Sequence, residues 1–201
     1  AKNNVYIDFP MLRMELPYLE TLQIQQPIYE VASNDTEENK QARLLKTLFD
    51  KKRYNVFLKT LDWFLAKYPE SPYDEIVRFM WADTYYAMWN DSRRAEEFDM
   101  AMLRYRQVLE KYPKSALVER TMLLMGLSSL DRGDYLGTLR LLQAHIQQRP
   151  QTPNKEIAQF AIADAYLKIS RFEETKNIYT EIENNSTSEK NRVRAAYRRG
   201  D

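Results

Sequence analysis

The side chains in this sequence that could carry out acid–base or nucleophilic chemistry are few and do not converge. His145 is the single histidine, and the 201 residues include no cysteine. Acidic pairs such as Glu96–Glu97 and Glu173–Glu174 are adjacent, so on a helix their carboxylates diverge by about 100°. No metal-binding, dinucleotide-binding or phosphate-loop motif occurs. We therefore expect no catalytic residue, no metal, no cofactor, no small-molecule substrate and no enzyme activity.

The densest group of functional side chains is the stretch FMWADTYYAMWN, residues 79–90. It holds five aromatic rings and one aspartate in twelve residues, a composition that resembles an aromatic ligand-binding box. On a helix, however, neighbouring side chains point to different faces. The repeats around this stretch are therefore needed to decide which rings face the core and which face outward.

The composition favours an all-α protein. There are only four glycines and eight prolines, and Leu, Ala, Glu, Lys and Arg are abundant. The 30 basic and 29 acidic side chains nearly cancel, so no overall field attracts nucleic acid. The longest uncharged apolar stretch, residues 121–130, is about half as long as a membrane-spanning helix. We expect no nucleic-acid partner and no transmembrane segment, and we interpret the basic run at residues 190–199 as surface.

Three proline-containing junctions punctuate the chain: YPES at residues 68–71, YPKS at 112–115 and RPQT at 149–152. Proline ends a helix because it lacks an amide donor and clashes with the preceding turn. Two residues later, a hydroxyl side chain can cap a new helix, and a glutamate then falls in its first turn, where negative charge suits the helix dipole. The hydroxyl residues are Ser71, Ser115 and Thr152, and the glutamates are Glu75, Glu119 and Glu156.

The spacing around the junctions repeats. Pro113 and Pro150 are 37 residues apart, whereas Pro69 and Pro113 are 44 apart, with the seven extra residues inside residues 90–99. The small residues thirteen positions after each proline are Ala82, Gly126 and Ala163, and the aromatics that begin the second helices are Tyr54, Phe98, Tyr135 and Phe172. We interpret each unit as a helical hairpin, in which the small residue permits close approach and the aromatic fills the elbow.

This pattern of small residue, aromatic and closing proline resembles the tetratricopeptide repeat (TPR). The resemblance covers residues 36–201 and departs from the pattern at Leu45, Thr138 and Thr175; the junctions are similar to those of BamD-type and CpoB-type envelope TPR proteins. It implies an all-α, right-handed superhelical solenoid of antiparallel helix hairpins, with about four and a half repeats. It also implies a protein or peptide partner and a periplasmic or outer-membrane-associated location, with the cytoplasm as the alternative.

The same register gives the domain organisation. We expect a solenoid over residues 34–201, with units at about 36–69, 70–113, 114–150 and 151–187 and the first helix of a further unit at 188–201. Thr187 stands at a proline position and Gly200 at the next small position, so we expect the natural chain to continue. Residues 1–33 are rich in proline and large apolar side chains, and we expect them to pack on the solenoid, over its first repeat or in its groove.

The functional surface of such an array is expected on the concave wall, which the first helix of each hairpin forms. By the resemblance, the candidate partner-binding residues are Phe79, Asp83, Tyr86, Leu123, Leu127, Leu130, Phe160, Asp164 and Lys168. The two aspartates would repel a terminal carboxylate, which argues against a carboxylate clamp. We expect instead an apolar helical or extended segment that can carry a basic residue.

Two alternatives stay open. The groove side chains can pack internally or lie beneath the N-terminal segment. The chain can also be a structural or self-associating module that uses its convex face or its ends, or a regulatory domain of a larger protein. In the hairpin interpretation, the stretch 79–90 divides into a core face with Trp81, Tyr85 and Trp89 and a groove face with Phe79, Asp83 and Tyr86.

Overall fold

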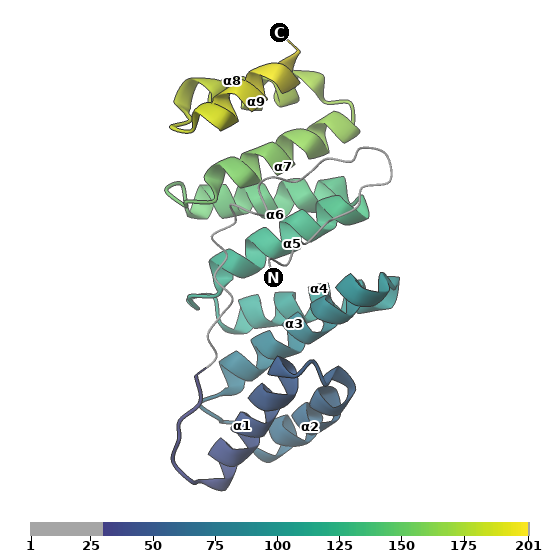
Figure 1. Cartoon of the computed structure of the whole chain (residues 1–201), viewed down its shortest axis with the longest axis vertical. Coiled ribbons are helices and arrows are strands. Elements are labelled where there is room, and N and C mark those ends of the chain that lie inside the picture. Colours follow the sequence, from purple (N-terminus) through teal and green to yellow (C-terminus); the bar gives the residue numbers. More distant parts are fainter. Residues whose placement is uncertain (1–29, 201) are drawn as a thin grey trace. The chain divides into compact units, whose positions relative to one another are not determined.

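The computed structural model describes residues 30–200, which form α-helices joined by short turns (Figure 1). No strand occurs in this range. The helices are α1 (Glu37–Asp50), α2 (Tyr54–Lys67), α3 (Asp74–Ser92), α4 (Ala95–Lys111), α5 (Val118–Arg132), α6 (Tyr135–Gln148), α7 (Lys155–Lys168), α8 (Phe172–Asn185) and α9 (Glu189–Arg199). The all-α fold class predicted from the sequence is confirmed.

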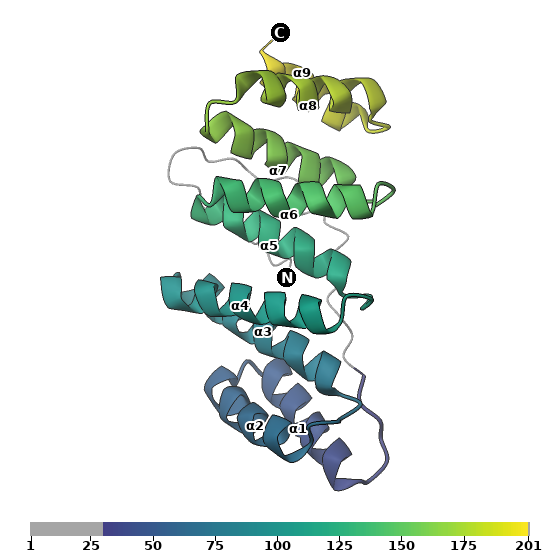
Figure 2. The same ribbon diagram turned by 180° about the vertical axis from the view of Figure 1, so that it is seen from behind.

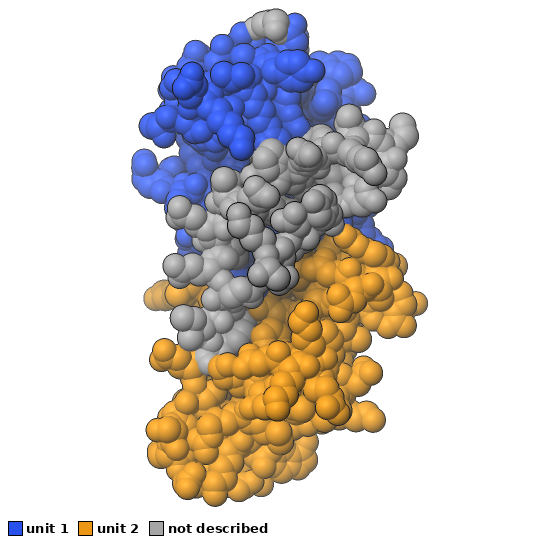
Figure 3. Space-filling view, in the orientation of Figure 1, with its two compact units in different colours: residues 1–25, 119–201 blue, residues 26–118 orange. Residues whose placement is uncertain are grey.

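The chain divides into two compact units (Figure 3). Residues 26–118 contain α1 to α4, and residues 119–201 contain α6 to α9 and all of α5 except its first residue. We refer to them as the α1–α4 unit and the α5–α9 unit. Within them, helices that follow one another in sequence lie against each other, as both ribbon views show for α3 with α4 and for α7 with α8 (Figure 2).

Of the predicted N-terminal segment, residues 1–29 lie outside the described residues. Its last part contacts the α1–α4 unit. The amide of Ala32 donates to the Tyr73 hydroxyl at 3.2 Å, and the carbonyl of Ala32 accepts from Arg43 Nη1 at 2.7 Å. These bonds tie the chain before α1 to the start of α3 and to α1 itself.

Polar side chains begin several helices. The Thr36 hydroxyl accepts from the amide of Asn39 at 3.2 Å, and the Asp134 carboxylate accepts from the amide of Gly137 at 2.9 Å. Each bond satisfies one of the amide donors that a helix leaves unpaired at its N-terminus. Local sequence therefore fixes where α1 and α6 start.

The proline junctions separate helices as predicted, but the new helices begin later than the hydroxyl residues suggest. Ser71 accepts from the amide of Tyr73 at 3.1 Å, and α3 begins only at Asp74. The same turn occurs at Ser115 and Thr152, with N···O distances of 3.1 and 3.2 Å. The prediction that these hydroxyls are helix caps is wrong, because each one bonds two residues ahead and shapes the turn before the helix.

The same polar residues also connect successive hairpins. The Ser115 hydroxyl donates to Glu75 Oε1 at 2.6 Å, so a glutamate in the first turn of one hairpin holds the junction that opens the next. We call this set of bonds the junction ladder. Its pairs are Glu75–Ser115, Glu119–Thr152 and Glu156–Asn191.

The core of the α1–α4 unit is built from apolar side chains of all four helices, with Val108 as the contribution of α4. Leu45 from α1, Phe57 and Phe64 from α2, and Phe79 and Met80 from α3 are fully buried in one cluster. Full burial of such side chains contributes about 1.5–3 kcal/mol each. Leu45, a departure from the TPR pattern, is thus accommodated as a core residue.

Close approach in the α5–α9 unit depends on the predicted small residues. A Cβ atom at Gly126 would lie 2.3 Å from Leu142 Cδ2, so only glycine permits this contact between α5 and α6. Ala163 on α7 is fully buried in a cluster with Tyr179 and Ile182. The interpretation of these two positions as close-packing contacts is confirmed.

Two details of the predicted register are wrong. Phe172 is 62% exposed and does not fill its elbow; Ile169, three residues earlier, packs against the core at that turn. Gly200 has φ 89° and ends α9 in the left-handed conformation, with open space around it. The fully buried small residue of α9 is Ala195.

Candidate protein-binding surface

Helix α3 carries the predicted groove residues of the α1–α4 unit. Phe79 is fully buried in the core, Asp83 is 6% exposed, and Tyr86 is half-buried with its ring 5.6 Å from that of Trp89. Of the three, Tyr86 therefore presents the most surface.

A hydrogen bond from the second helix of the hairpin holds Asp83. The Tyr105 hydroxyl on α4 donates to Asp83 Oδ1, and Tyr105 is itself fully buried. A buried carboxylate needs such a donor, because transfer out of water without one is costly. The bond thus fixes the position of the Asp83 carboxylate.

The same pair recurs on α7 and α8. Asp164 Oδ1 accepts from the Tyr179 hydroxyl at 3.3 Å. The partners are 15 residues apart here and 22 apart in Asp83–Tyr105, a difference equal to the seven-residue insertion of that hairpin. Burial raises the pKa of the Tyr179 hydroxyl, and the nearby Asp164 charge raises it further. The hydroxyl therefore stays protonated and remains a donor.

Asp164 also binds a cation from within the chain. Arg198 Nη1 on α9 lies 2.8 Å from Asp164 Oδ1, with both side chains mostly buried. The guanidinium carbons of Arg194 and Arg198 lie 4.9 and 6.0 Å from the centre of the Phe160 ring. The interpretation of the basic run 190–199 as surface is wrong for these arginines; their four-residue spacing, which places them on one helix face, was the available signal.

In α5 the corresponding positions are apolar. Leu123 and Leu130 are buried in the core with Leu142 of α6, and Leu127 is half-buried against the same cluster. Leu127 stands at the aspartate position and Leu142 at the tyrosine position of the register. An apolar contact thus replaces the hydrogen-bonded pair in this hairpin.

The nine candidate residues therefore differ in accessibility. Five are buried, three are half-buried and one, Lys168, is exposed at the end of α7. The buried ones are Phe79, Asp83, Leu123, Leu130 and Phe160, and the half-buried ones are Tyr86, Leu127 and Asp164. The structure brings Phe160 and Asp164 together under the α9 arginines.

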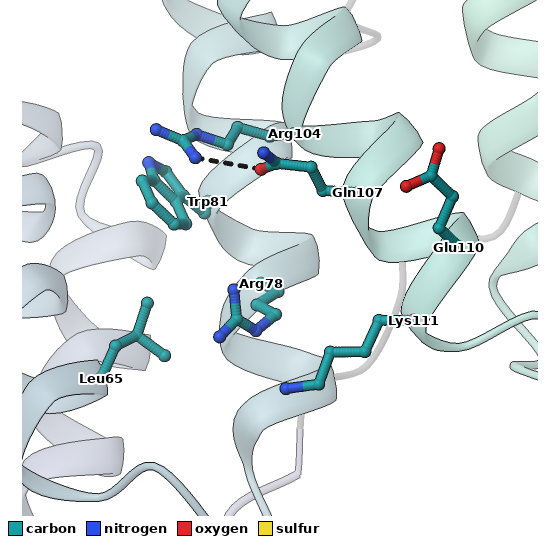
Figure 4. A pocket seen from close by; sticks show the side chains of 7 residues that line it. All are labelled: Leu65, Arg78, Trp81, Arg104, Gln107, Glu110 and Lys111. Atoms are coloured by element: carbon teal, nitrogen blue, oxygen red, sulfur yellow. Dashed lines mark hydrogen bonds between the residues drawn. The ribbon is translucent and has the colours of Figure 1, made fainter.

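The α1–α4 unit also holds an open pocket of about 640 Å³ that the sequence analysis did not predict (Figure 4). It is lined by Leu65, Arg78, Trp81, Arg104, Gln107, Glu110 and Lys111. The guanidinium carbon of Arg104 lies 3.6 Å from the centre of the Trp81 ring. Trp81 packs against the core cluster, as predicted, and its half-buried side chain also borders the pocket; Trp89 is buried as predicted.

Asp74 anchors two of the pocket's cations. Its carboxylate accepts from Arg78 Nε at 2.7 Å, from Lys111 Nζ at 2.7 Å and from the Tyr112 hydroxyl. Burial alone would raise the pKa of this carboxyl, but the three hydrogen bonds outweigh it and lower the pKa below its ordinary value. Asp74 is therefore a fixed negative charge beneath the pocket.

The part of the chain from 30 to 200 holds no cluster of three His, Cys, Asp or Glu side chains suited to a metal ion. His145 on α6 is fully buried, and neither of its ring nitrogens has a hydrogen-bond partner among the described residues. None of the described helices is both long enough and apolar enough to cross a bilayer.

Comparisons with known proteins identify relatives of the chain. Residues 19–125 match the sequence model of a family named YfiO and described as outer membrane lipoprotein. A crystal structure of a protein described as a Podospora anserina kinesin light chain, with nearly identical TPR-like repeats, superposes with a TM-score of 0.54. It is 14% identical, and the match covers 83% of this chain and 86% of that one. No curated protein matches in sequence. The likeness confirms the TPR-like fold.

Proposed function

The chain belongs to the YfiO family of outer membrane lipoproteins, and from this membership and its TPR-like hairpins we propose that it is a non-catalytic scaffold that binds a protein partner at the bacterial outer membrane. Arrays of helix hairpins present extended surfaces to other proteins. Membership of an outer membrane lipoprotein family supports a site of action in the cell envelope, on the periplasmic side. A regulatory role in a larger protein would use the same binding surface.

The partner segment is apolar and carries a basic residue, and it lies against the first helices of the hairpins. Tyr86 in the α1–α4 unit, and Leu127 and Lys168 in the α5–α9 unit, keep accessible surface and make the first contacts on their own units. The buried candidate residues form the wall beneath, and the hydroxyls of Tyr105 and Tyr179 keep its aspartates in place. A wall fixed in advance loses little entropy when a partner binds.

One contact carries this proposal. Arg198 of α9 makes an ion pair with Asp164 and lies beside the Phe160 ring. A guanidinium over an aromatic face and next to a carboxylate gains both cation–π and Coulomb attraction. The chain's own α9 thus supports the idea that this wall accepts arginine or lysine on an apolar segment.

Site-specific photo-crosslinking tests the proposal. A benzophenone amino acid replaces Tyr86 or Leu127 in the full chain, and Lys59 on α2 and Lys176 on α8 serve as exposed control positions. Irradiation with an envelope fraction of the source organism should give discrete protein adducts at Tyr86 and Leu127 only. Equal adducts at all four positions, or adducts at the two controls alone, would reject the groove.

A second candidate function is self-association through α9. Val193 and Tyr197 are 63% and 84% exposed on this helix, although both are large and apolar or aromatic. Exposed apolar patches of this kind mark contact surfaces in soluble proteins. Self-association through this face would make the chain a structural module.

A further inference from the structure

The pocket between α2, α3 and α4 carries more positive charge than its own carboxylates neutralise. Arg78, Arg104 and Lys111 line it, and Glu110 is the one acidic residue among the lining side chains. Asp74 below the pocket is a single carboxylate shared by Arg78 and Lys111. One cationic charge therefore remains without an ion pair among these side chains.

Arg104 is the cation left over. Its Nη1 donates to Gln107 Oε1 at 3.0 Å, whereas its Nε is buried and has no hydrogen-bond partner among the described residues. Burial is the main cause that lowers the pKa of this guanidinium; Tyr85 and Asp62 oppose the shift, and the Arg78 charge adds to it. An unpaired buried donor on a charged group is costly, so the guanidinium as a whole is under-satisfied and its other donors gain from an added acceptor.

The geometry of Arg104 is suited to a planar anion. The guanidinium carbon lies over the Trp81 ring, 3.6 Å from the ring centre, and the group reaches from there to Gln107 at the pocket wall (Figure 4). A carboxylate accepts two parallel bonds from a guanidinium edge. Leu65 and Trp81 add apolar surface next to it, against which the carbon chain of an acidic residue can pack.

The acidic side chain in the pocket lining favours a carboxylate over a phosphate as the ligand. Glu110 lines the same pocket and repels a doubly charged phosphate more strongly than a singly charged carboxylate. With Asp74 already bound to two of the cations, the surplus matches one negative charge.

We propose that this pocket binds an aspartate or glutamate side chain of a protein partner, with Arg104 as the bidentate donor and Lys111 as a second cation. Lys111 is half-exposed, so it can turn toward an anion while Arg78 stays on Asp74. The site uses other side chains than the proposed groove and does not depend on groove binding.

A peptide titration on the full chain tests this site. The Trp81 indole NH resonance, assigned by comparison with Trp81→Phe, reports binding of acetyl-Ala-Glu-Ala-amide, acetyl-Ala-Gln-Ala-amide and inorganic phosphate, so that the Glu peptide carries a single negative charge. The Glu peptide should shift the resonance in a saturable way and bind at least about tenfold tighter than the Gln peptide, as expected for a charge-assisted bond. Equal binding of both peptides, or tighter binding of phosphate than of the Glu peptide, would overturn the proposal.

Two variants and one matched control complete the test. Arg104→Gln should weaken the Glu peptide by about tenfold or more. Gln107→Glu places a carboxylate of the chain beside the Arg104 guanidinium. This carboxylate should compete with the Glu peptide for Arg104 and weaken its binding about as much as Arg104→Gln does. Because Arg104 stays in place, this variant still tests the site if Arg104→Gln does not fold. Arg106→Gln on the same helix removes the same charge outside the pocket and should leave the affinity unchanged. Unchanged affinity in Gln107→Glu would contradict the assignment.

Discussion

At the scale of single residues, the aspartate–tyrosine pairs show how carboxylates are accommodated between packed helices. Asp83 and Asp164 occupy the same register position, and a tyrosine from the second helix bonds each of them. A carboxylate at such a site is stable only if its donors are retained. Each hydrogen bond thus joins the two helices of a hairpin and also fixes the aspartate of the first helix.

The Tyr105→Phe variant should show how much the bond to Asp83 stabilises the hairpin. The change leaves the ring in place but removes the donor of a buried carboxylate, so the free energy of unfolding should fall by about 1–3 kcal/mol. Urea denaturation followed by circular dichroism measures it. Tyr85→Phe, a half-buried tyrosine of α3, is the control and should stay within about 0.5 kcal/mol of the parent. Equal losses in both variants would contradict the role of the Tyr105 bond.

The buried His145 gives the fold a pH dependence. Burial lowers its pKa from the ordinary 6.5, Glu119 opposes that shift, and Arg149 adds to it. As the pH falls, the unfolded chain takes up the proton first, so it binds more protons than the folded chain and stability is lost. The free energy of unfolding should therefore be constant above pH 6.5 and decrease below it.

Denaturation curves between pH 5 and pH 8 test this, with His145→Leu as the comparison. Because His145 is the single histidine, the variant should lose most of the decrease between about pH 6.5 and pH 5.5. An identical pH profile in the variant would assign the effect to other groups.

At the scale of elements, the hairpin pattern was predictable because it rests on local chemistry. Proline stops a helix, a small residue permits close packing, and both signals recur at fixed spacing. The helix starts were less predictable, since a hydroxyl can bond either the amide of the first helical turn or the amide two residues ahead. Ser71 and Ser115 take the second option.

Helix α3 shows why the faces within an element could not be assigned from the sequence. It contacts α1, α2 and α4, so it is surrounded on several sides and apolar residues do not mark a single face. Phe79, predicted for the groove, therefore lies in the core, and Trp81, which packs against the core as predicted, also borders a pocket. The pocket itself was not predictable, because its cations come from two helices and one of them, Lys111, bonds to Asp74 across 37 residues of sequence.

The junction ladder makes a prediction at this scale. Ser115→Ala removes both the turn-forming acceptor and the bond to Glu75, and the unfolding free energy should fall by about 1–2 kcal/mol. Hydrogen exchange should show the loss at the start of α5 and at the start of α3. Thr187→Ala, at an exposed position, is the control and should have little effect. Exchange that rises evenly over all helices would contradict a local ladder.

At the scale of the whole molecule, the chain combines near-neutral charge with local concentrations of charge. The 30 basic and 29 acidic side chains nearly cancel, so long-range attraction of a partner is weak and specificity must come from contact sites. The proposed groove and the Arg104 pocket are two such sites of opposite preference, one for a basic and one for an acidic residue. A partner that carries both residue types would gain attraction from both sites, whereas a partner with only one type would not.

The exposed face of α9 decides whether copies of the chain also bind each other. Val193 and Tyr197 lie four residues apart, so they share one face of the helix, and together they expose a large apolar area. If this face is a self-association surface, sedimentation velocity should show a concentration-dependent dimer that disappears in Val193→Glu/Tyr197→Glu. Lys176→Glu, at an exposed position of α8, changes the charge without altering that apolar pair and should leave the dimer intact. A parent chain that stays monomeric at all concentrations would reject self-association and leave partner binding as the role of the array.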